Sequence, residues 1–225
     1  MRTLAVVQDI LSANDVLARE NRERFDRAGV LAVNLMSSPG AGKTSLILRT
    51  AEALGGQLRL GVIEGDVASR VDAERVAAVG LPVVQVNTGG GCHLDANMLR
   101  VALKEFPLEG IDLLIIENVG NLICPAAFRL GEHIQVVIAS LPEGHDKPLK
   151  YPALFIQADA ILVNKADLGP YLDFDLEEFR RVVAGMNPRG ALFEISCRTG
   201  EGIPAWATWL QEHWAALRAG QAAGG

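Results

Sequence analysis

Residues 31–48, which read LAVNLMSSPGAGKTSLIL, decide the fold. An apolar run of strand length, residues 31–36, leads into a short loop of Ser, Pro and Gly. The loop then opens into the apolar residues 46–48, which have helical spacing. A glycine-rich loop between a strand and a helix is the context that a phosphate-binding loop requires. The pattern therefore predicts a nucleotide site at the end of the first strand.

The chemistry of this loop follows from its residue types. Gly40 and Gly42 let the backbone approach phosphate oxygens, Lys43 is placed to reach the β- and γ-phosphates, and the Thr44 hydroxyl suits Mg²⁺. Ser37 stands where the usual motif has its first glycine, so the entry to the loop lacks glycine's conformational freedom. A chance glycine turn is the alternative, and the flanking strand and helix argue against it. The loop residues that we expect to bind nucleotide are Ser38, Gly40, Ala41, Gly42, Lys43, Thr44 and Ser45.

Length and charge limit the class of protein. The 225 residues are 49% hydrophobic, which is enough material for one α/β core, and the net charge of −6 argues against a nucleic-acid or anionic-membrane surface. Three cysteines without closely repeated spacing are typical of a reducing compartment. The sequence has no apolar stretch of spanning length and no signal-like start, so we expect a cytoplasmic location.

Strands and helices alternate after the loop. The predicted strands are residues 31–36, 58–66, 81–87, 112–118, 134–140, 160–167 and 191–196, and helical spacing recurs between them, for example at 73–79, 96–103 and 176–186. Near-continuous Val/Ile/Leu strands separated by helices predict an α/β P-loop NTPase fold, with a mostly parallel sheet of about seven strands flanked by helices. Ligands bind such sheets at the carboxyl ends of the strands.

Three regions are expected along the chain. Residues 1–28 form an N-terminal helical extension of two amphipathic segments, with Asn14 breaking or capping between them, and its simplest role is a packing brace. Residues 29–217 form one P-loop domain, which the base-reading motif described next predicts to be a GTPase domain. Residues 218–225, which end in small residues, form a flexible tail.

A base-reading motif follows the predicted sixth strand. Asn164, Lys165 and Asp167 form N-K-x-D, in which the aspartate carboxylate can accept two hydrogen bonds from the guanine edge and so select GTP over ATP. Lys165 can lay its stem along the base, and Asn164 can tie this loop to the phosphate loop. The second base-contacting loop is expected at Ser196, Cys197 and Arg198. A plain polar turn is the alternative.

Acidic residues at strand ends are candidates for the Mg²⁺ site. The fourth strand ends at Glu117, which takes the place of the aspartate found in most GTPases, and the backbone N–H of Gly120 is then the sensor of the γ-phosphate. Asp66 ends the second strand and could reach Mg²⁺ through water, or it could be a solvated loop carboxylate. The predicted Mg²⁺ ligands are Thr44, Asp66 and Glu117, and the predicted catalytic residues are Lys43, Thr44, Asp66, Glu117 and Gly120.

A second metal site is suggested beside this sensor. Cys92 and His93 are adjacent in NTGGGCHLDA, and Cys124 lies in ENVGNLICP. Two thiolates and an imidazole suit a soft or borderline divalent ion such as Zn²⁺ or Ni²⁺. From the residues alone, small packing cysteines are an equal alternative.

The ordered motifs identify a resemblance. SSPGAGKT, VIEGD, QVNTGGGCHLDA, ENVGNLICPA, EGHDKPLKYP, NKADLGPYL and SCRTGEG resemble the HypB family, the GTPase accessory proteins for nickel incorporation into hydrogenase. The resemblance implies that Cys92, His93 and Cys124 form a metal site at a GTP-dependent homodimer interface and that Ser37 is normal. It also implies that Lys147 reaches nucleotide across the dimer, although a solvated lysine is an equal alternative.

Partners are expected from the same resemblance. They are a nickel-binding HypA-type accessory protein and the hydrogenase large subunit, with no nucleic acid and no membrane. The N-terminal cysteine motif and the histidine-rich run of many relatives do not occur in these 225 residues.

The expected activity is a slow switch. GTP with Mg²⁺ would order the loops around Asp66 and Gly120, and hydrolysis to GDP would release that order and alter metal affinity. No glutamine follows Gly120 to position water, so turnover should be slow. Two alternatives stay open: a GTPase chaperone of the urease or cobalamin type, and a module that binds nucleotide without hydrolysing it.

Overall fold

The structure is a computed structural model that describes residues 6–67 and 69–224. Its strands are β1 (Leu31–Ser37), β2 (Leu60–Asp66), β3 (Val83–Asn87), β4 (Leu113–Glu117), β5 (Ile134–Ser140), β6 (Ala160–Asn164) and β7 (Ala191–Glu194). Its α-helices are α1 (Val6–Ala28), α2 (Lys43–Leu54), α3 (Val71–Ala78), α4 (Ala96–Glu105), α5 (Lys147–Lys150), α6 (Pro152–Gln157), α7 (Leu176–Met186) and α8 (Ile203–Gly224). None of the helices in the described ranges combines the length and apolar character needed to cross a membrane.

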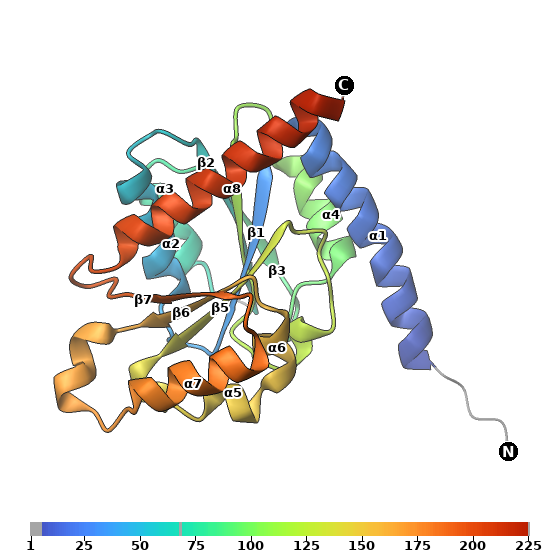
Figure 1. The fold of residues 1–225 in the computed structure, drawn as a ribbon. Helices are drawn as coiled ribbons and strands as arrows, with labels where there is room; N and C mark the ends of the chain where they lie inside the picture. Colours follow the sequence, from blue (N-terminus) through green and yellow to red (C-terminus); the bar gives the residue numbers. More distant parts are fainter. Residues whose placement is uncertain (1–5, 68, 225) are drawn as a thin grey trace, which may run out of the picture.

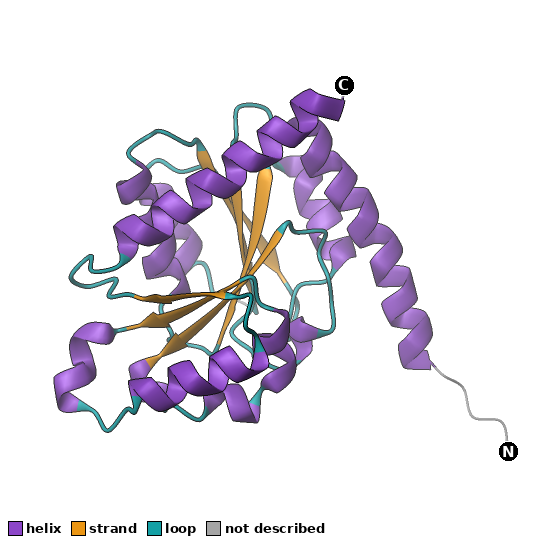
Figure 2. Ribbon diagram, in the orientation of Figure 1, coloured by secondary structure: helices purple, strands orange, loops and turns teal. Residues whose placement is uncertain are grey.

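The strands form a single sheet in the order β3-β2-β4-β1-β5-β6-β7, and every pairing is parallel. The predicted sheet of about seven strands is therefore confirmed. Helices cover both faces (Figures 1 and 2). The central strand β1 ends at the phosphate loop, between β4 and β5. The carboxyl ends of neighbouring strands thus meet around that loop, which is the edge where parallel sheets bind ligands.

Side chains of β1 enter the core on both faces of the sheet. Leu31 and Val33 belong to a buried cluster that includes Trp206 of α8, whereas Ala32 belongs to a cluster with Phe25 of α1. Successive residues of a strand point to opposite faces, so an almost continuous apolar strand is what two covered faces demand. The residues of β1 are all buried, which fixes the start of the phosphate loop firmly in the core.

The N-terminal helix differs from its prediction. Residues 6–28 form one continuous helix, α1, rather than two segments, and residues 1–5 of the expected extension lie outside the described residues. Asn14 does not break the helix because its buried amide has partners elsewhere. It donates to Arg129 O (2.8 Å) and accepts from Ala96 N (2.9 Å), at the start of α4. The helix serves as a packing brace against α4, with Phe25 fully buried.

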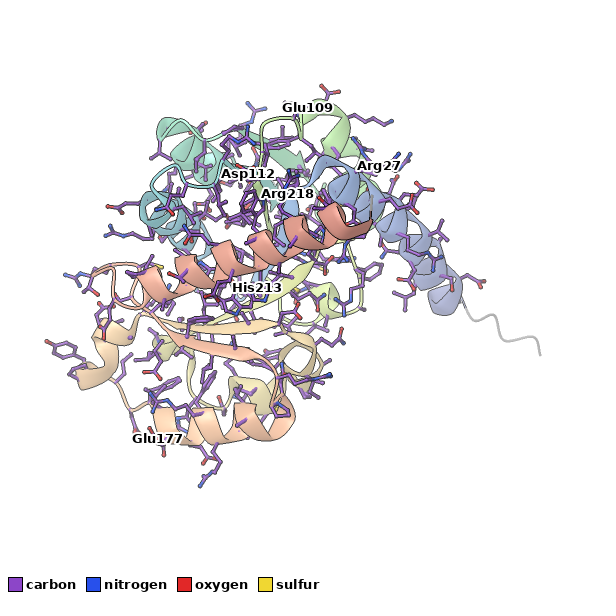
Figure 3. All side chains as sticks on the ribbon, turned by 45° about the horizontal axis from the view of Figure 1, so that its top comes forward. Arg27, Glu109, Asp112, Glu177, His213 and Arg218 are labelled. Atoms are coloured by element: carbon purple, nitrogen blue, oxygen red, sulfur yellow. The ribbon has the colours of Figure 1, made fainter. Side chains whose placement is uncertain are left out.

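The C-terminal residues also differ from the expected flexible tail. Residues 218–224 continue helix α8, and Gly225 lies outside the described residues. Gln221 Nε2 donates to Asp26 O of α1 (2.6 Å). Arg218 lies near Asp112, where hydrogen bonds from Arg59 and the charge of Arg218 lower the pKa of the Asp112 carboxyl (Figure 3). These contacts of Arg218 and Gln221 with the rest of the protein stabilise the last turns of α8.

Candidate functional site

The phosphate loop has the backbone that its sequence predicts. Gly40 and Gly42 have φ of 77° and 106°, in the left-handed region that favours glycine. Ser37, in contrast, has no positive φ, so its position does not need glycine. Its buried hydroxyl donates to Ser38 O (2.7 Å) and accepts from Lys43 Nζ (3.2 Å). Serine here therefore orients the lysine that we expect to bind phosphate.

The N-K-x-D loop is tied to the phosphate loop. Asn164 Nδ2 donates to Ala41 O (2.8 Å), as the sequence predicts, and Lys165 Nζ donates to Gly40 O (2.8 Å). Asn164 Oδ1 also accepts from Cys197 N (3.2 Å). One buried amide therefore joins the phosphate loop, the N-K-x-D loop and the loop after β7.

Asp167 lies at the cavity expected for the base. Its Oδ1 accepts from Ser196 Oγ at 2.6 Å, which brings the two predicted base loops together. A cavity of about 350 Å³ is lined by residues of all three loops: Gly40, Gly42, Ser45, Asn164, Lys165, Asp167, Leu168, Cys197 and Arg198. Burial raises the pKa of the Cys197 thiol to about 11, so this sulfur is protonated at neutral pH.

Arg49 is a residue of this site that the sequence analysis missed. It lies on α2, and its guanidinium donates to Cys197 O (2.7 Å) and Arg198 O (3.0 Å). The helix that starts at the phosphate loop therefore also holds the loop beside the base. No motif marks Arg49, because it binds backbone carbonyls and the partner loop is far away in the sequence.

The predicted Mg²⁺ ligands Thr44 and Glu117 are in contact. Thr44 Oγ1 donates to Glu117 Oε1 at 3.0 Å, and Glu117 Oε2 is buried without a hydrogen-bond partner in the described part of the chain. Burial raises the pKa of Glu117 to about 7, although the nearby charge of Lys43 lowers it. A hydroxyl beside an under-satisfied carboxylate is a donor set that fits Mg²⁺.

Glu64 is a second buried acid that the sequence analysis did not single out. It pairs in register with Glu117 on the neighbouring strand and is 2% exposed. Burial and the charge of Glu117 raise its pKa to about 8. Its signal was an acid within the strand sequence LRLGVIEGD, two residues before Asp66.

Asp66 ends β2, and Gly120 lies in the loop after β4. Asp66 Oδ1 accepts from Ser69 N (2.6 Å) and so caps its own loop. A Cβ atom on Gly120 would lie 2.9 Å from Pro39 Cγ, so Gly120 packs directly on the phosphate loop. Glycine is required at 120 by this close approach.

Lys147 is not the solvated lysine that stood as an alternative. Its ammonium donates to Ser38 Oγ (3.0 Å) of the phosphate loop in the same chain, and its side chain is 16% exposed. It also pairs with Glu143 (3.2 Å) and lies over the Tyr151 ring. Lys147 therefore lies beside the predicted phosphate site of its own subunit.

Cys92, His93 and Cys124 are brought together by the loops after β3 and β4. Their ligand atoms all lie within 4.8 Å of one another, with Cys92 Sγ 3.1 Å from Cys124 Sγ and 3.6 Å from His93 Nδ1. A metal ion with bonds of about 2.0–2.3 Å can span such separations. The His93 ring is held against Phe128, with ring centroids 4.2 Å apart.

The protonation of Cys92 and His93 bears on how a divalent cation would bind this triad. Burial lowers the pKa of His93, which favours the neutral imidazole that binds metal. The hydrogen bond to Cys124 raises the pKa of the Cys92 thiol, so a metal ion must displace the proton of Cys92. Cys92 is exposed, which leaves the site open to solvent.

The parallel sheet and its phosphate loop define a P-loop NTPase. A family model described as CobW/HypB/UreG, nucleotide-binding domain, matches residues 31–194. The hydrogenase maturation factor HypB of Azotobacter vinelandii is 53% identical over 211 residues, which cover 93% of this chain and 69% of that protein. HypB of Escherichia coli K12 is 48% identical over 210 residues, 93% of this chain and 72% of that protein. The chain belongs to the HypB family of hydrogenase maturation factors.

A solved structure supports the same relationship. The crystal structure of HypB from Helicobacter pylori in complex with nickel aligns with a TM-score of 0.87 and 36% sequence identity. The alignment covers 91% of this chain and 96% of that one. The predicted fold and the family resemblance are therefore both confirmed.

Proposed function

We propose that this protein is a GTP-hydrolysing metallochaperone that couples GTP-dependent dimerisation to nickel delivery during maturation of [NiFe]-hydrogenase. The observation that carries this proposal is the position of the metal triad. Cys124 begins a short 3-10 helix, Cys124–Ala126, four residues after Gly120, which packs on the phosphate loop. A nucleotide sensor and a metal ligand thus share one segment of backbone.

Guanine selection is assigned to Asp167. Asp167 Oδ1 already accepts from Ser196, which orients the carboxylate at the mouth of the base cavity. A carboxylate accepts hydrogen bonds and cannot donate them when ionised, so it favours the two donors on the guanine edge. The ties from Asn164 and Lys165 to the phosphate loop would keep the base and phosphate subsites at a fixed spacing.

Phosphate chemistry is assigned to the loop and to the acidic strand end. Lys43 would bind the β- and γ-phosphates, and Gly120 would sense the γ-phosphate through its N–H. Thr44 and Glu117, with Asp66 through water, would hold Mg²⁺, which supplies charge neutralisation at the transferred phosphoryl group. The residues after Gly120 are Asn121 and Leu122, neither of which is the usual water-positioning glutamine, so we expect slow turnover.

The cargo is assigned to Cys92, His93 and Cys124, with Ni²⁺ or Zn²⁺ as the ion. In the proposed cycle GTP pairs two subunits, and the triads, in which Cys92 is exposed, meet at the new interface. Hydrolysis then separates the subunits and changes metal affinity. A HypA-type nickel protein and the hydrogenase large subunit are the partners that membership of this family suggests.

Metal titration in two nucleotide states tests the proposal. Ni²⁺ and Zn²⁺ are titrated into the protein with GDP and with a non-hydrolysable GTP analogue, and sedimentation is measured on the same samples. We expect a dimer with the analogue and a metal dissociation constant that differs between states by about 5- to 150-fold. Substituting Cys92 or Cys124 with Ala should remove the metal and spare basal GTP hydrolysis. Identical metal affinities in both states would overturn the switch.

A further inference from the structure

Asn118 is a fully buried side chain between the acidic end of β4 and Gly120. Its backbone N–H donates to Leu35 O of β1 (3.0 Å), which holds the residue against the centre of the sheet. A buried amide must find partners for its oxygen and its nitrogen, since an unpaired polar group in the core is destabilising. The partners of Asn118 therefore reveal which segments it holds in place.

The carbonyl oxygen of Asn118 joins the metal-binding loop to the sensor. Oδ1 accepts from Leu94 N at 3.0 Å and from Val119 N at 3.0 Å. Leu94 follows the metal candidate His93, and Val119 precedes Gly120. One oxygen atom therefore fixes the residue after a metal ligand and the residue before the γ-phosphate sensor.

The amide nitrogen of Asn118 extends this link toward the phosphate loop. Nδ2 donates to Asn34 Oδ1 at 3.2 Å, and Asn34 is a buried residue of β1, the strand that runs into the loop. Leu94 is itself fully buried and packs on Gly65, where a Cβ would lie 2.6 Å from Leu94 Cγ. The metal loop is thus attached to the core at the residue next to its histidine.

Asn121 forms a second, more exposed link on the other side of Gly120. Its Nδ2 donates to Cys92 O (3.2 Å), and its Oδ1 accepts from Ile123 N (2.9 Å), beside Cys124. The two asparagines therefore bracket Gly120, and each binds the backbone of the loop that carries Cys92 and His93. Because Asn118 is buried, water cannot replace its hydrogen bonds, whereas it can replace those of the more exposed Asn121.

We propose that Asn118 is the positioning residue that transmits the nucleotide state of Gly120 to the site of a thiophilic divalent cation. This inference rests on the proposed function. When Val119 and Gly120 move to contact a γ-phosphate, Asn118 Oδ1 either moves Leu94 with them or loses a hydrogen bond in a dry environment. His93 and Cys92, which directly precede Leu94, then change position relative to Cys124. Metal affinity and nucleotide state become linked through one side chain.

The test compares wild type with Asn118→Ala, Asn118→Asp and Asn87→Ala. The probes are Ni²⁺ and Zn²⁺ alone, titrated with GDP and with the GTP analogue, and the readout is the ratio of the two dissociation constants. Asn118→Ala should bring this ratio to within about twofold of one, while metal still binds in the GDP state. Asn118→Asp keeps the oxygen acceptor, and Asn34 Nδ2 has no partner within the described chain and can turn to donate to it. That variant should keep most of the coupling.

Asn87→Ala is the matched control. Asn87 ends β3, directly before the loop that carries Cys92 and His93, but its Oδ1 accepts from Gly89 N (2.8 Å) and caps its own turn. In Asn87→Ala the ratio of the metal dissociation constants with GDP and with the GTP analogue should equal that of wild type. A general loosening of the loop would lower the ratio in this control as well, which would overturn a specific role for Asn118.

Two outcomes separate this inference from the proposed function. A large ratio in wild type that persists in Asn118→Ala would overturn the inference and leave the switch intact. A ratio of one in wild type would overturn both. If Asn118→Ala does not fold, amide hydrogen exchange in wild type provides the test: protection of Leu94 N–H and Val119 N–H should change together between GDP and the GTP analogue. An unchanged Leu94 would overturn the inference.

Discussion

Glu64 and Glu117 lie opposite each other on the neighbouring parallel strands β2 and β4, with both carboxyl groups buried. Each has one oxygen without a hydrogen-bond partner among the described residues. Burial is the main reason that their pKa values rise to about 8 and about 7. The nearby charge of Lys43 lowers both pKa values but does not offset the burial, so the two acids cannot both ionise cheaply. The metal-free protein therefore carries an electrostatic cost at the site proposed for Mg²⁺.

The first prediction concerns pH and stability without metal. A carboxyl whose folded pKa is raised contributes stability below its unfolded pKa of about 4.5, and that contribution is lost as pH rises through the folded pKa. The free energy of unfolding in EDTA should therefore fall between about pH 5 and pH 8 because of Glu64 and Glu117. Glu64→Gln should reduce this fall by on the order of 2 kcal/mol.

Urea unfolding of wild type and Glu64→Gln at several pH values measures this difference. The comparison between the two proteins cancels the opposite contribution of His133, whose pKa is lowered mainly by burial. Parallel pH profiles for the two proteins would show that Glu64 does not titrate in this range.

The second prediction concerns the choice of base. Asp167→Asn should weaken GTP binding by about 100-fold or more, because the amide puts a donor where guanine also has donors. Xanthine nucleotides, which present the complementary pattern, should bind better to the variant. Fluorescent nucleotide titration measures both. Asp175→Asn is the control, since Asp175 caps α7 through Glu178 N (2.8 Å). Equal GTP binding by wild type and Asp167→Asn would reject the base assignment.

The third prediction concerns the phosphate lysine. Lys43→Ala should lower GTP hydrolysis by about 100-fold or more, since a positioned charge at the developing phosphate charge is lost. Metal binding without nucleotide should persist, because Lys43 contacts Ser37 within the phosphate loop. Single-turnover phosphate release measures the first effect and metal titration the second. Lys104→Ala, in the last turn of α4, is the control. Retained turnover would remove Lys43 from its role.

The fourth prediction concerns Lys147 and dimerisation. Lys147→Ala should reduce the dimer formed with the GTP analogue, as measured by sedimentation. The sequence alone predicts no loss of monomer stability, but in the structure the Glu143 carboxylate, 15% exposed, would lose its ion pair. We now expect a loss of about 1–3 kcal/mol in the monomer. GDP affinity at low protein concentration shows whether Lys147 acts in its own subunit, as its contact with Ser38 favours. Unchanged sedimentation would reject a role in the dimer.

Local sequence patterns predicted the parts of this site that local chemistry determines. The strand, the glycines and Lys43 follow one another in the chain, so their geometry needed no distant partner. Asn164 reached Ala41 as expected because N-K-x-D motifs and phosphate loops share one edge of a parallel sheet. Tertiary contacts determined the rest. Arg49 and Asn118 act on backbone groups of distant loops, and such bonds leave no spacing pattern in the sequence.

The errors at the two ends of the chain have the same origin. Asn14 has low helix propensity, yet its buried amide binds Arg129 O and Ala96 N, and tertiary hydrogen bonds outweigh propensity. The many small residues in 218–224 led to the prediction of a flexible tail, but Gln221 donates a hydrogen bond to the backbone of α1 and the segment is helical. Glu64 was missed because Asp66, at the end of the same strand, was taken as the acid that faces the site, and no sequence pattern shows that Glu64 lies beside Glu117.

The central place of β1 in the sheet also bears on how the protein is made. Leu31 pairs with Leu113 and Val33 with Ile134, so the strand that leads into the phosphate loop has no neighbour until much of the chain has left the ribosome. At ordinary synthesis rates that interval lasts on the order of ten seconds. During this time an apolar strand, buried along its whole length in the folded protein, is exposed to other nascent chains. From this strand order we expect chains that stop before β5 to aggregate more readily than the full chain.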